Sequence, residues 1–331
     1  MAKCWQFSDY VGLDMCKLFV IFSLLISSCS VASSLVFINL TVVDSQSEQP
    51  VSGARVQFAF QKSRGATLSE EVTDLEGKSS ASGVGGYGVN IHAEKKGYYY
   101  SRRTITKRGS LTVDLKLRKV VNPVPMYAKK AKIILPQSGV LYGFDFTKGD
   151  LVAPHGEGLT PHVRLMVAGE KQDVFNYDKT LTLSFSKNDG IVQYDSGVSV
   201  KESKFKFPYL APENGYHNIL EKHERRWQKE VGYSYDHGLE GDYHRFQLGY
   251  AFRVNSEVDK DGDLISANYG KIYGEFAAYL HGTNTPSLSD GQAMVVFTYS
   301  YNPVANERSL EFDVKKNLFG RLPSEISVSE P

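Results

Sequence analysis

The sequence predicts a mainly β protein, in which an N-terminal antiparallel β-sandwich is followed by a second β-rich domain with one helix. Three observations carry this prediction. Strand-favouring aromatic residues are abundant (20 Tyr and 18 Phe), 29 Gly and 12 Pro supply turns, and apolar residues alternate with polar ones along many short segments. The length of 331 residues fits two domains at roughly 150 residues each.

Residues 1–33 are predicted to be a signal peptide. No charged residue occurs from Leu18 to Ile38, and small residues fill the second half of this stretch, as expected of an export signal. Met15 is an alternative start, because it leaves one lysine directly before the apolar stretch. The residues that precede Cys29 resemble a bacterial lipobox, which would make Cys29 the site of lipid attachment and anchor the chain to a membrane.

Two other fates of this segment stay open. Cleavage at Val31-Ala32-Ser33 would release the chain, and about 20 apolar residues could also remain as an uncleaved anchor. The three cysteines, Cys4, Cys16 and Cys29, all lie at or before the cleavage region, so the mature chain is predicted to contain no disulfide. We therefore expect an exported protein, either a lipoprotein of the periplasm or cell surface or a secreted protein.

Residues 35–118 are predicted to form the first sandwich. Apolar residues alternate with polar ones along four segments that turn-forming residues separate, which is typical of short antiparallel strands. The alternating positions are Val36, Ile38, Leu40 and Val42; Val56, Phe58 and Phe60; Tyr87, Val89, Ile91 and Ala93; and Leu111, Val113, Leu115 and Leu117.

Several motifs in this region resemble a known family. They are Asp44, Pro50–Val56, Thr73–Lys78 and Ile91–Tyr98. Together they are similar to the carboxypeptidase regulatory-like domain. The resemblance implies a prealbumin-like (transthyretin-like) sandwich of seven strands that serves as an accessory module, and it implies nothing about catalysis.

A basic segment near the end of this domain is a candidate binding loop. Six cations fall within 14 residues and are interleaved with three tyrosines: Lys95, Lys96, Arg102, Arg103, Lys107 and Arg108. Basic groups beside aromatic rings can hold an anionic polymer such as envelope polysaccharide. The alternative is a solvated strand–turn–strand, which is the more frequent explanation of a charge run.

Residues 119–130 are predicted to be a linker, because Pro123 and Pro125 interrupt any strand or helix period. A β-rich domain of unrecognised family is predicted over 131–318, and residues 319–331 are predicted to form a tail. Strand patterns occur at Thr180–Phe185, Ile191–Val192, Phe205–Tyr209, Phe246–Val254, Ala293–Tyr301 and Leu310–Val314.

One helix is predicted from about Asn218 to Val231. Apolar and aromatic residues recur there at helical spacing, at Ile219, Leu220, His223 and Trp227. Asn218 and Glu221 resemble a capping box, and the following Gly232 is a suitable terminator.

The strongest metal candidate is an acidic run in the second domain. Asp259, Asp261 and Asp263 alternate around a glycine, and carboxylates at such positions can wrap calcium. The twelve-residue pattern of an EF-hand is absent, because Leu264 and Gly270 occupy its glycine and glutamate positions. A hairpin with an Asp-Gly turn explains the same residues without metal, and we expect no other cofactor.

A second acidic segment has the composition of a ligand site. Asp145, Asp150, His155 and Glu157 lie in a glycine-rich stretch and could gather around a ligand, although a loop between strands explains them equally. For acid–base chemistry, Glu224, Glu240 and Asp242 could supply a carboxyl pair, and the distance between carboxyls would decide its mechanism.

Overall charge argues against one class of partner. The 38 Lys and Arg balance the 37 Asp and Glu, whereas nucleic-acid binding depends on an excess of basic contacts. We expect a non-catalytic envelope or surface protein that binds glycan or a protein partner. A glycan hydrolase with an Asp/Glu pair in the second domain and a structural component of a surface assembly are the alternatives.

Overall fold

The computed structural model describes residues 34–107, 109–195, 202–236, 248–282 and 288–331. Five predictions fall outside these residues: the signal peptide 1–33, lipid attachment at Cys29, and the assignments to Arg108, Glu240 and Asp242. The described residues form strands and turns without a helix, so the mainly β class is confirmed. No described helix, accordingly, is long and apolar enough to cross a membrane.

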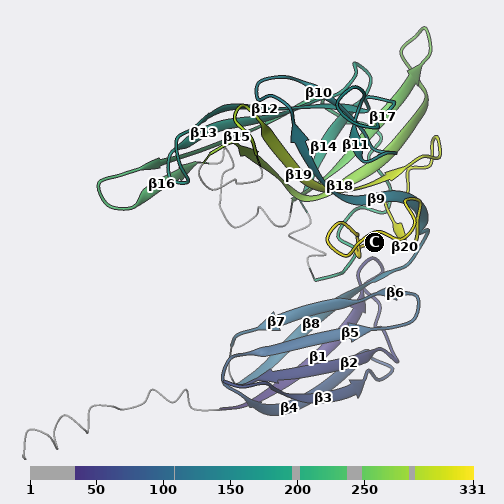
Figure 1. The fold of residues 1–331 in the computed structure, drawn as a ribbon. Coiled ribbons are helices and arrows are strands. Elements are labelled where there is room, and N and C mark those ends of the chain that lie inside the picture. The colour runs from purple at the N-terminus through teal and green to yellow at the C-terminus, as the bar shows by residue number, and fades with distance from the viewer. Residues whose placement is uncertain (1–33, 108, 196–201, 237–247, 283–287) are drawn as a thin grey trace, which may run out of the picture.

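The first eight strands form a sandwich of two four-stranded sheets, in the orders β4-β1-β8-β6 and β3-β2-β5-β7 (Figure 1). Their bounds are β1 Ser34–Asp44, β2 Arg55–Gln61, β3 Ala66–Val72, β4 Lys78–Gly85, β5 Val89–Glu94, β6 Tyr98–Tyr99, β7 Ser101–Ile105 and β8 Ser110–Lys119. Neighbouring strands are antiparallel with one exception: β1 and β8 run parallel. The prediction of a fully antiparallel sandwich is wrong for this one pair, in which the first and last strands of the sandwich lie side by side.

The predicted alternation fills the core of this sandwich. The inward residues of β1 are 0–1% exposed, and the inward residues of β2, β5 and β8 pack against them. Gly83 on β4 lies over the ring of Phe60, where an added Cβ would come within 2.5 Å of the ring. A glycine is therefore required at this position for the two sheets to close.

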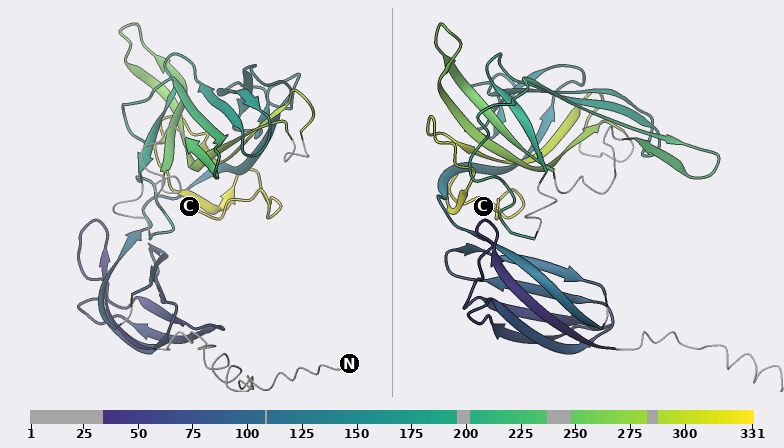
Figure 2. Two further views of the ribbon diagram at one scale, coloured as in Figure 1. Left: turned by 90° about the vertical axis from the view of Figure 1, so that its left-hand side faces the viewer. Right: turned by 180° about the vertical axis from the view of Figure 1, so that it is seen from behind.

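The remaining strands form a second sandwich of two six-stranded sheets, β11-β10-β12-β13-β15-β16 and β14-β17-β18-β19-β9-β20 (Figures 1 and 2). Their bounds are β9 Val124–Leu135, β10 Tyr142–Asp145, β11 Asp150–Leu151, β12 Val163–Lys171, β13 Tyr177–Ser184, β14 Gly190–Asp195, β15 Ile219–Gln228, β16 Tyr233–Asp236, β17 Leu248–Val258, β18 Leu264–Leu280, β19 Ala293–Asn302 and β20 Phe312–Asn317. Its core is rich in aromatic rings. Phe146 stacks on Phe252 with 4.4 Å between ring centroids.

The predicted helix at 218–231 is wrong, because residues Ile219–Gln228 form strand β15. β15 pairs with β13 and β16, and its residues alternate between exposed and half-buried. The matches to helical spacing arose from a few large side chains on a strand that is polar on one face. Pairing with two neighbours supplies the hydrogen bonds of the backbone and overrides that local pattern.

Two other boundaries differ from the sequence prediction. β9 begins at Val124, inside the predicted linker, and pairs with β19 from Tyr127 onward. The terminal tail packs along the second sandwich: the amide of Lys130 donates to the carbonyl of Ile326, and Val328 lies against the apolar cluster of β9 and β20. The segment Phe205–Tyr209, predicted as a strand, is an irregular segment whose two phenylalanines are buried.

A buried arginine joins the two sandwiches. Arg118, at the end of β8, is 6% exposed, and its guanidinium donates to the carbonyls of Phe205 at 2.9 Å and Phe207 at 2.6 Å. The guanidinium also lies 4.5 Å from the ring centroid of Phe205 and 4.4 Å from that of Tyr209. Arg118 therefore ties the first sandwich to an irregular segment of the second.

A buried carboxylate reinforces the same joint. Glu311 is 1% exposed, accepts a hydrogen bond from the hydroxyl of Tyr99 at 2.9 Å, and accepts the amides of Val121 at 3.0 Å and Asn122 at 2.6 Å. Burial, together with the hydrogen bond to Glu311, raises the pKa of Tyr99, so the hydroxyl keeps its proton. The joint is thus a satisfied polar cluster rather than a loose hinge.

Candidate functional site

The best candidate site is a hollow on the outer face of the sheet that contains β12, β13, β15 and β16. Its volume is about 330 Å³, at the lower end of the range for small-ligand sites. It is lined by Glu170, Gln172, Asn176, Tyr177, Asp178, Arg225, Arg226 and Trp227. We call it the β15 face. The β15–β16 hairpin projects beyond the rest of the sandwich (Figures 1 and 2).

Strand register brings the polar groups of this face together. Asp178 on β13 pairs with Arg225 on β15 and with Glu170 on β12, and residues that pair directly across strands point to the same side of a sheet. Trp227 lies two residues beyond Arg225, so it shares that side. Three strands therefore contribute two carboxylates (Glu170 and Asp178), one guanidinium and one indole to a common surface.

The side chains of the face contact one another closely. The guanidinium of Arg225 lies 5.0 Å from the Trp227 ring centroid, and its Nε is 3.6 Å from Oδ2 of Asp178. The other oxygen of that carboxylate, Oδ1, is 2.7 Å from Nε2 of His223. These charged side chains are about half exposed. Exposed ion pairs add little to stability, so a ligand can replace these contacts at low cost.

A turn fixes the hairpin beside Trp227. The Asp173 carboxylate accepts the side-chain amide of Asn176 at 3.0 Å and the backbone amide of Phe175 at 2.6 Å. These hydrogen bonds lower the pKa of Asp173. The Asn176 side chain in turn accepts the backbone amide of Gln228 at 3.0 Å. The β12–β13 turn is thus tied to β15 next to the indole, which holds the face in shape.

This composition suits recognition of a polyhydroxylated ligand. An aromatic ring offers an apolar surface to the C–H face of a sugar, while carboxylates, amides and guanidinium groups exchange hydrogen bonds with hydroxyls. Charge-assisted hydrogen bonds are roughly twice as strong as neutral ones. The β15 face carries an aromatic ring and charged hydrogen-bonding groups side by side.

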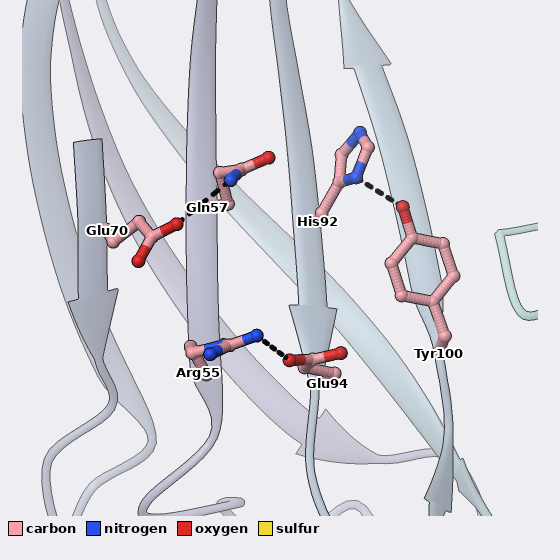
Figure 3. A pocket seen from close by; sticks show the side chains of 6 residues that line it. All are labelled: Arg55, Gln57, Glu70, His92, Glu94 and Tyr100. Atoms are coloured by element: carbon pink, nitrogen blue, oxygen red, sulfur yellow. Dashed lines mark hydrogen bonds and ion pairs between the residues drawn. The ribbon is translucent and has the colours of Figure 1, made fainter. Parts of the chain in front are cut away.

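A smaller hollow of about 110 Å³ lies on the outer face of the first sandwich (Figure 3). Its polar side chains pair with one another: Arg55 with Glu94 at 2.6 Å, Gln57 with Glu70 at 3.1 Å, and the Tyr100 hydroxyl with Nδ1 of His92 (Figure 3). The volume of this hollow is about a third of that of the β15 face, and no tryptophan lines it, so we rank it below the β15 face.

Histidine 92 in that hollow is neutral near pH 7. Burial and then the charge of Arg102 lower the pKa of His92, while burial raises the pKa of Tyr100. A neutral imidazole that carries its proton on Nε2 accepts a hydrogen bond at Nδ1 from the Tyr100 hydroxyl. Both side chains are then engaged with each other, which is typical of a structural hydrogen bond.

The five described cations of the predicted basic loop lie in separate parts of the first sandwich. Lys95 and Lys96 lie at the turn before β6, whereas Lys107 lies beyond the far end of β7. Lys95 donates to the carbonyl of Ser52. Arg102 and Arg103 are adjacent in β7, so they point to opposite sides of the sheet, and Arg103 donates to the carbonyl of Asp114 at 2.7 Å.

The acidic run at Asp259–Asp263 forms the turn between β17 and β18. Oδ1 of Asp259 accepts the backbone amides of Asp261 and Asp263, each at 2.9 Å, so the predicted hairpin alternative describes the segment. Within the residues that the structure describes, no group of three or more His, Cys, Asp or Glu side chains is placed to hold a metal ion.

The acidic glycine-rich loop is organised by its own backbone. Both oxygens of Asp145 accept amides, Oδ1 from Thr147 at 2.7 Å and Oδ2 from Leu159 at 2.9 Å. The two oxygens of Asp150 likewise accept the amides of Leu151 and Glu157. The His155 ring packs edge-on against Tyr142. The predicted ligand set is therefore occupied in holding the loop.

Glu224, the one described member of the predicted carboxyl pair, faces a cation. Its Oε2 lies 3.0 Å from Nζ of Lys179, and both side chains are largely buried. Lys179 is its direct partner across β13 and β15, on the side opposite to Arg225. Glu224 therefore belongs to an ion pair and lies away from the β15 face.

Sequence reasoning missed the β15 face. Trp227, Arg225 and His223 were interpreted as parts of a helix, on which Arg225 would point away from the other two. No alternation marks them in the sequence, because the intervening residues Lys222, Glu224 and Arg226 are charged as well. Asp178 could be assigned to this site only once the pairing of β13 with β15 was known, and the local sequence does not specify that pairing.

Comparison with known proteins finds no matching protein-family model and no similar curated protein. Among solved structures the chain is similar to a protein from Bacteroides uniformis to which carbohydrate binding is provisionally assigned (12% identity over 82% of this chain and 98% of that one, TM-score 0.21). It is also similar to a Streptococcal ancillary pilin (9% identity, 77% and 61%, TM-score 0.20) and to BcpA, the major pilin subunit of Bacillus cereus (11%, 80% and 95%, TM-score 0.21). These likenesses are remote and carry no argument about the site.

Proposed function

We propose that this chain is an exported, non-catalytic surface protein that binds glycan through the β15 face. The observation that carries the proposal is the half-exposed cluster in which Trp227, Arg225 and Asp178 meet on an outer face. Ordering exposed charges costs side-chain entropy and returns little stability. Binding of a ligand to the same groups would account for this ordered arrangement.

The resemblance of the first sandwich to carboxypeptidase regulatory-like domains supports an accessory role. In that role the first sandwich supports the second sandwich. The buried joint at Arg118 and Glu311 holds the binding face in a fixed orientation. The N-terminal export signal would place the face outside the cytoplasm.

Affinity electrophoresis through gels that contain amylopectin, xylan, polygalacturonate or chondroitin sulfate tests the proposal. At least one polysaccharide should retard the protein, and Trp227→Ala or Asp178→Asn should reduce the retardation at least tenfold. Glu221→Gln is the matched control, because Glu221 is an exposed residue of the same strand outside the hollow. Equal retardation of all four proteins would refute the β15 face as the binding site.

The same samples separate binding from hydrolysis, which is the main competing prediction. A hydrolase releases soluble oligosaccharides with time, whereas a binding protein leaves the polymer length unchanged. Size-exclusion chromatography of the incubated polysaccharide should show no shortening. Shortening that the Trp227→Ala variant loses would replace the binding proposal with a catalytic one.

A further inference from the structure

The free end of the first sandwich has an unusual surface. β1 begins there, at the end opposite to the joint with the second sandwich: Phe37 pairs with Ser110 at the start of β8, and Asp44 pairs with Leu117 next to Arg118 (Figures 1 and 2). The chain therefore enters the sandwich at this end from the uncharged stretch that starts at Leu18.

Strand β1 is apolar on both sides where it begins. Leu35 is 51% exposed and Phe37 46% exposed, while the alternate residues between them fill the core. Val84, the direct partner of Leu35 on β4, is 40% exposed. Farther along β1 the next outward residues, Asn39 and Thr41, are polar, and Val43 near the other end is half-buried. The exposed apolar positions of β1 thus lie at the free end.

The loops of the same end add an aromatic ring and cations. The carbonyl of Gln61 accepts the amide of Tyr87 at 3.2 Å, which places the β4–β5 turn beside the β2–β3 turn that carries Lys62 and Arg64. Tyr87 is 55% exposed. The amide of Phe37 donates to the carbonyl of Gly109 at 3.0 Å. This bond places the β7–β8 connection beside β1.

The described charged side chains at this end of the first sandwich are all basic. Lys62, Arg64 and Lys107 are all exposed. The described residues of the segments that meet here, 34–38, 61–67, 84–90, 104–107 and 109–111, contain no Asp or Glu. We call this surface the apolar–basic end, defined by Leu35, Phe37, Val84, Tyr87, Lys62, Arg64 and Lys107.

We propose that the apolar–basic end docks on a bilayer surface that carries anionic headgroups. Apolar and aromatic side chains enter the boundary between headgroups and acyl chains, and basic side chains beside them meet lipid phosphates. The direction of the chain supports this occupant, because the uncharged stretch from Leu18 leads directly into β1 at this end. The contact does not depend on lipid at Cys29 or on glycan binding at the β15 face.

A chain that begins at residue 34 tests the proposal without the N-terminal stretch. It retains every described residue, and the cores of both sandwiches consist of residues from Val36 onward. In flotation assays it should bind vesicles of phosphatidylglycerol and phosphatidylcholine, bind pure phosphatidylcholine vesicles weakly, and be released by 0.5 M NaCl.

Two variants and one control make the test specific. Each basic residue near an anionic surface contributes about fivefold to partitioning. The triple change Lys62→Ser, Arg64→Ser and Lys107→Ser should therefore weaken vesicle binding about hundredfold. Phe37→Ser should weaken binding to the mixed vesicles at low salt without changing the charge of the protein, because it removes apolar contact. The control, Lys78→Ser with Lys96→Ser and Lys132→Ser, removes the same charge from exposed positions elsewhere and should retain binding.

Two results would overturn the proposal. One is equal binding to both kinds of vesicle, which would show that anionic headgroups are not recognised, or an equal loss in the control triple variant, which would show that overall charge suffices. The other is a dimer in sedimentation velocity that Phe37→Ser dissociates, because the patch would then be covered by a second copy of the chain.

Discussion

Asp145 shows how one buried carboxylate can determine a loop. It is 1% exposed, and its two oxygens accept hydrogen bonds from both ends of the segment between β10 and β12. Burial alone would raise the pKa of Asp145, but the hydrogen bonds from Thr147, Leu159 and Thr160 outweigh burial and lower it to about 2. The anionic form is therefore part of the folded structure.

Replacing this carboxylate should destabilise the protein in a pH-dependent way. The folded pKa lies below the unfolded value of 3.8, so ionisation favours the folded state above that value and the benefit is lost as pH falls toward 2. Asp145→Asn should cost about 2 kcal/mol in urea unfolding at pH 6 and less at pH 2.5. Asp263→Asn, in the exposed β17–β18 turn, is the control. A cost for Asp145→Asn that is independent of pH would contradict this role.

The positions of single residues also explain why the described cations of the basic segment lie apart. Cations close in sequence predicted a binding loop, yet β7 separates the five that the structure describes and places them at two ends and on two faces of a sheet. Proximity in sequence specifies proximity in space only within a turn. Lys107 instead joins Lys62 and Arg64, which come from a distant part of the sequence.

At the scale of elements, alternation was an accurate guide wherever one face of a strand is buried. β1, β2, β5 and β8 lie where the alternating residues predicted them, because their inward positions fill a single core. β15 was misread because both of its faces carry polar or half-buried residues. One of its two partners, β13, is distant in the sequence, and no local pattern reveals that pairing.

A pair of substitutions at Glu221 distinguishes the two assignments for β15. Valine favours strands and alanine favours helices. On the exposed side of a strand, Glu221→Val should be more stable than Glu221→Ala by up to about 1 kcal/mol. In a helix the order reverses. Urea unfolding of the two variants measures the difference, and a more stable alanine variant would contradict the strand.

At the scale of the whole molecule, the joint makes two sandwiches into one unit. Arg118 and Glu311 are buried and satisfied, and the apolar cluster around them takes residues from both sandwiches. None of these partners is predictable from sequence, because Arg118 and Phe205 are 87 residues apart. The sequence predicted two domains joined by a short linker, and the buried contacts couple the two sandwiches.

Removing Arg118 should uncouple the sandwiches. Arg118→Ala leaves the carbonyls of Phe205 and Phe207 without their donor, at a cost of about 3 kcal/mol. The wild-type chain should unfold in one calorimetric transition and the variant in two. Arg55→Ala is the control, because the Arg55–Glu94 pair is exposed and adds little. A single transition at an unchanged temperature in Arg118→Ala would show that the joint does not couple the sandwiches.

The central claim is glycan binding at the β15 face, and the fluorescence of Trp227 can report on it directly. The sequence contains two tryptophans, Trp5 and Trp227, so a chain that begins at residue 34 has Trp227 alone. We would titrate that chain with oligosaccharides of the polymer that retards it most and record tryptophan emission. The account predicts a saturable shift of the emission with the affinity found by calorimetry. Binding by calorimetry with no change in Trp227 emission would contradict it, since the ligand would then lie elsewhere on the molecule.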